Sequence, residues 1–207
     1  MADLRSYIFL DSLQPQFAAF LGTVASGFLP REKQAALFVE ISPGMEIQRL
    51  TDVALKATDV MPGMQIVERV FGMLEVHSDS QANVRAAGQA ILNALELKEE
   101  DRIKPKIYTS TVIRALSDYH TQLINRVRHG NMISPGESLY VMECAPAAYM
   151  AYAANEAEKA ANINILEVRT FGSFGRMYMG GEERDIVVGH KAAEQAIESL
   201  TGRDDKK

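Results

Sequence analysis

The chain is an internal duplication, because a run of residues near its middle reappears near its end. The first copy starts at Pro43 and continues through Lys56, and the second starts at Pro146 and continues through Lys159. Lys56 and Lys159 are 103 positions apart in a chain of 207 residues. A duplicated sequence predicts two similar folding units about a pseudo-twofold axis, and a ring of such chains presents two units per chain. This pattern favours an assembly subunit over an enzyme.

The predicted offset between equivalent residues of the two copies changes slightly along the chain. Leu37 aligns with Leu139 and Leu95 with Leu200, which gives offsets of 102 and 105 residues on either side of the lysine pair. Surface loops tolerate insertions, so we assign this drift to the loops.

Composition narrows the class of protein. Hydrophobic residues make up 47% and charged residues 24%, which is typical of a globular protein. The formal net charge of −5 disfavours a non-specific nucleic-acid binder, which would be basic. Cys144 is the single cysteine, so no intrachain disulfide can form and a reducing cytoplasm is expected. No apolar run approaches the roughly 20 residues of a membrane helix, so no membrane partner is predicted.

Both halves predict the same order of elements. In the first half we expect strands at 6–10, 36–41, 64–67 and 72–76, an apolar segment at 17–24, and helices at 43–58 and 80–95. In the second half we expect strands at 106–112, 139–144, 165–170 and 176–179, and helices at 113–127, 146–161 and 182–200. Each half is therefore predicted to be an α+β sandwich, with helices on one side of a small sheet. The expected domains are 1–100 and 105–203, joined by a charged linker at 97–104.

One predicted helix has a clear apolar face. In the segment 113–127, Leu116, Tyr119, Leu123 and Val127 recur at helical spacing. This pattern predicts an amphipathic helix with these four side chains on one face.

The duplicated motifs resemble those of a known family. Ala54-Leu55-Lys56-Ala57 and Glu158-Lys159-Ala160-Ala161 are each followed by a strand, a short loop, a strand and a final helix. They look like the tandem-domain, trimeric class of bacterial microcompartment shell proteins. The stretch 159–163, followed by the loop 171–175, also resembles the pattern of the single-domain hexameric shell proteins. The resemblance covers nearly the whole chain.

Several segments resemble the carboxysome members of this class more narrowly. They are Leu4–Tyr7, Glu40–Gly44, Val67–Arg69, Pro105–Ile107, Glu156–Ala160 and Gly180–Ile186.

The resemblance implies an architecture and a role. Each half would be a circularly permuted shell domain with a ferredoxin-like sandwich, and three chains would form a pseudohexameric tile around a pore. Two trimers could stack. The tile would belong to the carboxysome shell in the cytoplasm, beside hexameric shell proteins, and would serve carbon fixation in photosynthesis. Its pore would pass larger phosphorylated metabolites such as ribulose bisphosphate and 3-phosphoglycerate.

The resemblance also assigns roles to particular residues. Glu68 and Arg69 would form the pore gate, with carboxylates and guanidiniums of three chains pairing across the threefold axis in one loop state. The other pore-lining residues would be Val67, Val70, Phe71, Gly72, Phe171, Gly172, Ser173, Phe174 and Gly175. The alternative is that Glu68 and Arg69 make ordinary surface pairs at a strand end, which is what an exposed ion pair usually is.

Lys56 and Lys159 match the lysine that lies along the seam between neighbouring tiles in the family. An alkyl stem that packs across a symmetric edge suits such a position. A solvated lysine on a helix is the alternative.

No catalytic residue, metal site or cofactor is predicted. The four histidines (His77, His120, His129 and His190) lack metal-ligand spacing, and Cys144 ends a buried strand. Three rival hypotheses remain: a shell protein of another microcompartment, a soluble trimeric regulator that binds a small ligand, and an enzyme using Glu68, Arg69 and Ser173.

Overall fold

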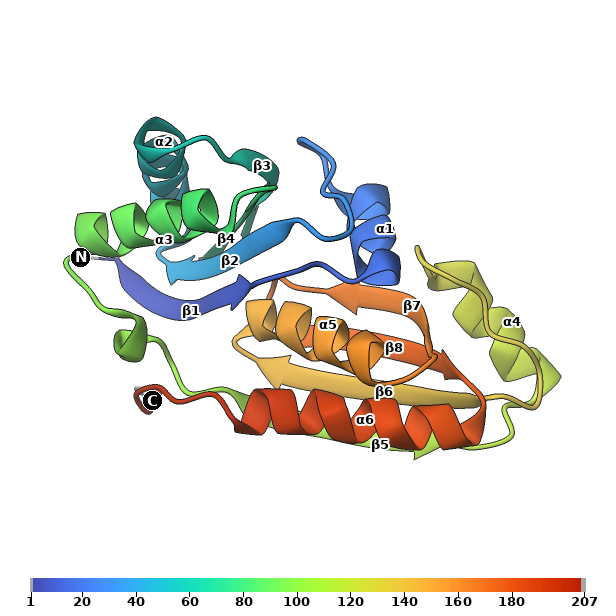
Figure 1. The fold of residues 1–207 in the computed structure, drawn as a ribbon. Coiled ribbons are helices and arrows are strands. Elements are labelled where there is room, and N and C mark those ends of the chain that lie inside the picture. The colour runs from blue at the N-terminus through green and yellow to red at the C-terminus, as the bar shows by residue number, and fades with distance from the viewer. Residues whose placement is uncertain (1, 206–207) are drawn as a thin grey trace.

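A computed structural model describes residues 2–205 and contains two four-stranded antiparallel sheets (Figure 1). The first half holds β1 (Asp3–Leu10), α1 (Pro15–Val24), β2 (Ala35–Ser42), α2 (Ile47–Ala57), β3 (Met61–Glu68), β4 (Phe71–Ser78) and α3 (Gln81–Leu95). The second holds β5 (Lys106–Ile113), α4 (Asp118–Val127), β6 (Ser138–Ala145), α5 (Met150–Ala160), β7 (Asn164–Arg169), β8 (Gly175–Gly181) and α6 (Glu183–Glu198). Short 3₁₀ turns, η1 (Gly44–Glu46) and η3 (Ala147–Tyr149), precede α2 and α5, and η2 (Glu99–Asp101) lies between the halves.

The two sheets have the same strand order, β1-β2-β4-β3 and β5-β6-β8-β7, and the same register. Ala35 pairs with Ser78 just as Ser138 pairs with Gly181, so equivalent strand residues are 103 positions apart throughout. The predicted alignment of Leu37 with Leu139 is therefore wrong by one residue. The prediction matched two leucines, whereas the one charged residue of each strand, Glu40 in β2 and Glu143 in β6, marks the true offset of 103.

The closing helices follow a slightly different spacing. The buried positions Val84, Ile91 and Leu95 of α3 repeat in α6 at Ile186, Ala193 and Ile197, an offset of 102. The predicted pairing of Leu95 with Leu200 is corrected accordingly.

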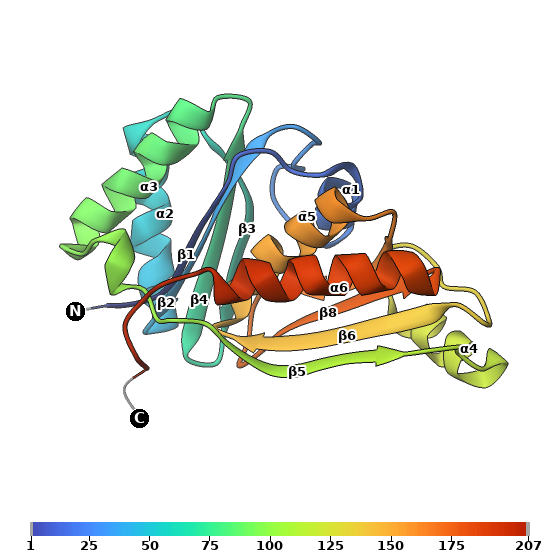
Figure 2. The ribbon, with the colours of Figure 1, turned by 60° about the horizontal axis from the view of Figure 1, so that its bottom comes forward.

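One face of the first sheet forms a core with the two helices of its own half. Leu37, Val39 and Ile41 alternate along β2 and pack with Leu74 and Val76 of β4 against α2 and α3. The second sheet packs in the same way against α5 and α6 (Figure 2).

The opposite face of the first sheet is also covered, which corrects the expectation of helices on one side only. Phe38 on this face stacks on Phe17 of α1, with ring centroids 6.2 Å apart. In Figure 2 the first sheet lies between α2 and α3 on one side and α1 on the other. The 3₁₀ turn η3 of the second half packs against β1 and β2 as well, and α5 packs against β1. A single core cluster therefore joins the two halves.

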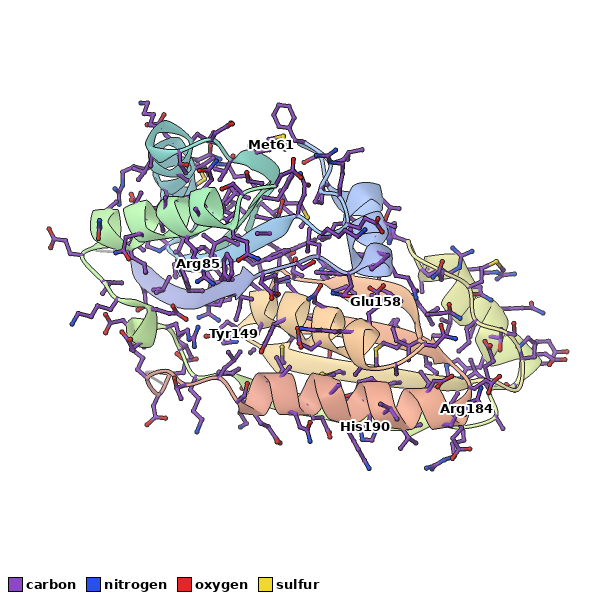
Figure 3. All side chains as sticks on the ribbon, viewed as in Figure 1. Met61, Arg85, Tyr149, Glu158, Arg184 and His190 are labelled. Atoms are coloured by element: carbon purple, nitrogen blue, oxygen red, sulfur yellow. The ribbon has the colours of Figure 1, made fainter. Side chains whose placement is uncertain are left out.

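The helix α1 is bound at its N-terminus by the second half (Figure 3). Gln14, its N-cap residue, makes no capping bond of its own. Instead the carboxylate of Glu158 on α5 accepts hydrogen bonds from the backbone N–H groups of Gln16 and Phe17 at 2.7 and 2.8 Å. These groups would otherwise be unsatisfied at the start of a helix. Burial raises the pKa of Glu158, against the lowering effect of those two bonds.

A buried ion pair lies at the same joint. Arg5 donates to Glu40 at 2.6 Å, and both side chains are almost fully buried. The second carboxylate oxygen of Glu40 accepts from the backbone N–H of Ala148 in η3 at 3.0 Å. The first half thus satisfies a backbone donor of the second.

The charged segment 97–104 is not a free linker. Arg102 is buried and donates to the carbonyls of Tyr7 and Thr201 at 2.9 Å, and to the carboxylate of Glu99 at 2.7 Å. This one side chain connects the first strand, the inter-half segment and the C-terminal segment.

The predicted helix at 113–127 begins later than expected, at Asp118, because β5 extends to Ile113. Leu116 is buried ahead of the helix, whereas Tyr119, Leu123 and Val127 are exposed. The predicted apolar face is therefore largely exposed in the single chain.

We expect Arg102→Met to lower the free energy of unfolding by about 2–4 kcal/mol, because it removes the donor to the buried carbonyl of Tyr7 and to the partly buried carbonyl of Thr201. Urea denaturation measures the change. Lys104→Met is the matched control, since Lys104 is an exposed neighbour and should change stability by less than about 0.5 kcal/mol. Equal losses in both variants would contradict the role of Arg102.

Candidate functional site

The candidate pore residues lie at the two hairpin turns that close the sheets. Glu68 and Phe71 are the last paired residues of β3 and β4, and Arg69 and Val70 form the tip between them. Arg69 has φ of +54°, in the left-handed region. Its equivalent in the second turn is Gly172, with φ of +98°. The same backbone geometry therefore carries a charged side chain in one turn and none in the other.

The two turns touch each other within one chain. The guanidinium of Arg169 at the end of β7 donates to the carboxylate of Glu68 at 2.8 Å. Arg169 also lies over the ring of Phe171, 4.7 Å from its centroid. A Cβ on Gly172 would stand 3.2 Å from a carboxylate oxygen of Glu68, so the glycine leaves room for this side chain. The side chain of Arg69 makes no hydrogen bond or ion pair with any residue between 2 and 205.

Arg169 is a site residue that the sequence did not indicate. It lies 101 positions from Glu68, and its equivalent in the first half is Ile66, so neither local pattern nor the repeat marks it. Only the folded joint between the halves brings the pair together.

The remaining predicted lining residues differ in exposure. Val67, Val70, Ser173 and Phe174 are exposed, while Phe71 and Phe171 are half-buried. Each turn has a neighbour from the first strand of its sheet: Arg5 lies over the Phe71 ring at 3.6 Å, and Tyr108 meets Phe174 edge-on at 4.9 Å.

Gly72 and Gly175 are buried, and both face the 3₁₀ turns. A Cβ on Gly72 would collide with the carbonyl of Gly44, and one on Gly175 with that of Ala147. Glycine at these equivalent positions therefore permits close backbone packing.

Lys56 and Lys159 occupy equivalent exposed sites in the last turns of α2 and α5. Lys56 pairs with Asp52 at 2.7 Å and Lys159 with Glu156 at 3.8 Å. Both lysines lie near the C-terminal ends of their helices, where the helix dipole favours cations. Each lysine is therefore accommodated in the single chain without a partner from a second copy.

The other titratable groups are distributed through the core and surface. Burial raises the pKa of the Cys144 thiol, which disfavours a thiolate. His77 pairs with Glu75 at 3.0 Å in the core, where burial raises the pKa of the glutamate. In the described part of the chain, three or more potential metal ligands do not gather anywhere. Likewise, the helices within residues 2–205 are all too short or too polar to cross a membrane.

Comparison with known sequences identifies relatives over almost the full length. A family profile described as the CsoS1D N-terminal domain matches residues 4–101. The carboxysome shell protein CcmP of Synechococcus elongatus is 56% identical over 98% of this chain and 95% of its own. The carboxysome shell protein CsoS1D of Hydrogenovibrio crunogenus is 47% identical over 98% of this chain and 100% of its own.

Solved structures agree with this relationship. The fused permuted hexameric shell protein MSM0275 of the RMM microcompartment superimposes with a TM-score of 0.94 at 44% identity, covering 98% of this chain and 100% of that one. The double-ringed trimeric shell protein MSM0271 of the same microcompartment gives 0.95 at 39% identity, covering 99% and 100%.

We expect Arg169→Met to free the first hairpin turn while changing stability by less than about 1 kcal/mol, because the pair with Glu68 is partly exposed. Amide hydrogen exchange should become faster at residues 67–72. Arg31→Met is the control, since it breaks an exposed pair with Asp79 (2.9 Å) at the opposite end of β4 from this turn. Unchanged exchange at 67–72 would show that Arg169 does not hold the turn.

Proposed function

The chain belongs to the family of carboxysome shell proteins that contain two fused shell domains, and on that premise we propose that it forms trimeric tiles with a gated central pore. Each tile would contain six units, taken as residues 1–100 and 105–203 of three chains. Glu68 and Arg69 would form the gate. Arg169 would bind Glu68 in one state, which leaves Arg69 free to face the opening, and would release Glu68 in the other state.

The observation that carries this proposal is the contact between the two hairpin turns. Glu68 and Gly172 lie side by side although the chain separates them by 104 residues. We place these adjoining turns at the axis of a closed ring of alternating units. Three charged turns would then alternate with three neutral ones around the opening.

The ion pair between Glu68 and Arg169 within the single chain would represent one state of the gate. With Glu68 bound to Arg169, each Arg69 is left for the opening, and three guanidiniums surround it. In the other state Glu68 leaves Arg169 and pairs with Arg69 of a neighbouring chain. An exposed pair contributes only about 0–1 kcal/mol, so exchanging one pair for another costs little and both states can be populated.

The chemistry of the first state suits phosphorylated metabolites. Guanidinium groups bind phosphate through paired hydrogen bonds. Each chain carries a formal net charge of −5, so the acidic tile would repel anions without a local cationic ring. We therefore assign ribulose bisphosphate and 3-phosphoglycerate, both anionic, as the class of solute that passes.

Stacking of two trimers is part of the proposal. It is supported by the double-ringed trimeric relative, which covers 99% of this chain. A stacked pair would enclose a chamber between two gates. The tile would lie in the shell among single-domain hexameric proteins, with Lys56 and Lys159 at its edge.

We expect Glu68→Ala to raise the fraction of open pores and Arg69→Ala to abolish the state in which carboxylate and guanidinium cross-pair. Cryo-electron microscopy of trimers, classified on residues 67–72, measures the two fractions. Arg49→Ala is the control, because Arg49 makes an exposed pair with Glu46 elsewhere on the chain. The same distribution of loop states in all variants would remove the gate from the proposal.

We expect the double variant Lys56→Asp and Lys159→Asp to abolish extended sheets, because the change places acidic groups along a shared edge. Negative-stain microscopy of concentrated trimers shows whether sheets form. Lys104→Asp with Lys191→Asp is the control, with equal charge at other exposed positions. If both double variants form normal sheets, the edge assignment is wrong.

A further inference from the structure

A glutamate and a histidine are buried together in the first sheet, away from the candidate pore. Glu75 and His77 lie on β4, and both side chains are 0% exposed. Glu75 is directly opposite Phe38 in the register, so the pair points to the face of the sheet that α1 covers. His77 Nδ1 lies 3.0 Å from Glu75 Oε1, whereas His77 Nε2 has no hydrogen-bond partner within residues 2–205. A buried acid–base pair with one unsatisfied nitrogen calls for a reason beyond packing.

The carboxylate of Glu75 anchors an irregularity in β3. This strand has a bulge between Pro62 and Met64. Glu75 Oε2 accepts a hydrogen bond from the backbone N–H of Gly63 at 3.0 Å, and the carboxylate also bonds the N–H of Met64. A Cβ on Gly63 would collide with this carboxylate, so the close approach needs glycine. Glu75 therefore satisfies backbone donors that the bulge removes from the regular ladder.

The same bulge connects two other parts of the first half. The N–H groups of Gly27 and Phe28, which follow α1, donate to the carbonyls of Gly63 and Pro62 at 2.9 Å. In the other direction β3 continues for four residues from Met64 to the hairpin turn, about 13 Å at 3.3 Å per residue. Glu75 is therefore placed at the base of the hairpin whose turn carries the candidate gate.

The second half builds the same backbone without an ionisable pair. β7 has the equivalent bulge, and the segment after α4 bonds to it through two N–H groups. Tyr178 and Gly180 take the positions of Glu75 and His77. A Cβ on Gly180 would stand 2.8 Å from Ile133, so an apolar side chain fills that space. The fold therefore does not require the pair, which occurs only in the hairpin with the charged turn.

Other charges around the pair are already bonded to their own partners. The helix α1 carries no charged residue. On the surrounding elements the bonded groups are Arg5 with Glu40, Arg31 with Asp79, Glu32 with Lys33, Glu68 with Arg169, and Glu158 with the N–H groups of α1. Among the titratable side chains of residues 2–205, only His77 acts on the pKa of Glu75. Burial raises that pKa, and the bonds to His77 and to the two N–H groups lower it by less.

A proton on Glu75 would weaken the anchor. The ionised carboxylate only accepts, whereas a protonated carboxyl must donate from one oxygen. At Oε1, His77 could accept only by moving its own proton to Nε2, where the described chain offers no acceptor. At Oε2, the O–H would face the N–H of Gly63. Since a neutral carboxyl is also the weaker acceptor, protonation loosens the bulge.

We propose that Glu75 and His77 form a pH-sensitive switch that controls how firmly the first hairpin turn is held. Ionised Glu75 anchors the β3 bulge and, through it, the turn. Protonated Glu75 releases Gly63, and the turn gains freedom to move Glu68 away from Arg169. The link to the pore rests on the proposed gate, whereas the switch itself belongs to the single chain.

The test uses Glu75→Gln, which fixes the neutral form. Amide hydrogen exchange, corrected for its intrinsic pH dependence, is measured at Gly63 and at 67–72. In the wild type these amides should open about 2- to 10-fold more readily below the pKa of Glu75 than above it, which is the effect of one ordinary hydrogen bond. Glu75→Gln should open at the faster rate at every pH. Glu198→Gln, at an exposed position of α6, is the control and should match the wild type. The second turn, 170–174, should not respond in any variant.

Infrared spectroscopy and denaturation identify the titrating group. The difference spectrum between acid and neutral pH should contain the C=O band of a buried protonated carboxyl, and Glu75→Gln should lack it. His77→Leu removes a donor to the anion, so the band should titrate at higher pH. Because burial raises the folded pKa above 4.5, the fold binds the proton more tightly than the unfolded chain. Between 4.5 and that pKa, the unfolding constant of the wild type relative to Glu75→Gln should rise with pH, by at most tenfold per unit.

The possible failures are distinguishable. Exchange at Gly63 that is independent of pH, or a pH response that survives in Glu75→Gln, would overturn the switch. A response in the turn that the pore classes of trimers, imaged at both pH values, do not follow would overturn only its link to the gate. A wild type that never forms trimers would remove the proposed tile, while the exchange data on the single chain would still decide the switch.

Discussion

The structure depends on the need to cover both faces of each small sheet. One face packs on two helices of its own half, but the opposite face of the first sheet is buried only because α1 and the second half lie against it. The buried pair of Arg5 and Glu40 is satisfied across the same joint by the N–H of Ala148. Removing one partner of such a pair costs more than the pair contributes, so the joint is specific as well as apolar.

The second sheet presents the same requirement with a different solution. Glu40 of the first sheet corresponds to Glu143, which is partly exposed and binds Arg176 and Thr109 instead of a backbone donor. Polar side chains allow this face of the second sheet to contact water in the single chain, whereas the equivalent face of the first sheet is buried within the chain itself. The halves are therefore alike in register and unlike in surface, as expected for units that meet a covalent neighbour on one side and another copy on the other.

Local patterns in the sequence predicted most of the fold, and the errors of that prediction arise where a local pattern carries too little information. Apolar runs and helical spacing identified every strand of both sheets, but the run before Cys144 was misaligned by one because leucines were matched in place of Glu40 and Glu143. The apolar face of α4 was recognised but no partner was assigned to it, since periodicity shows that a face is apolar and not what covers it. Arg169 and Arg102 were missed because their partners lie about 100 residues away.

Fusion of two copies permits a turn geometry that two identical turns could not have. Glu68 fits beside the second turn because Gly172 has no side chain there, and a Cβ at that position would stand 3.2 Å from the carboxylate. If both turns carried Glu and Arg, every carboxylate would face a side chain in place of that space, and like charges would adjoin. Divergence lets one turn carry the charges while the other provides room and Arg169 as counter-ion. A charged turn in this position therefore requires an unlike neighbour, and the diverged second half of the same chain supplies it.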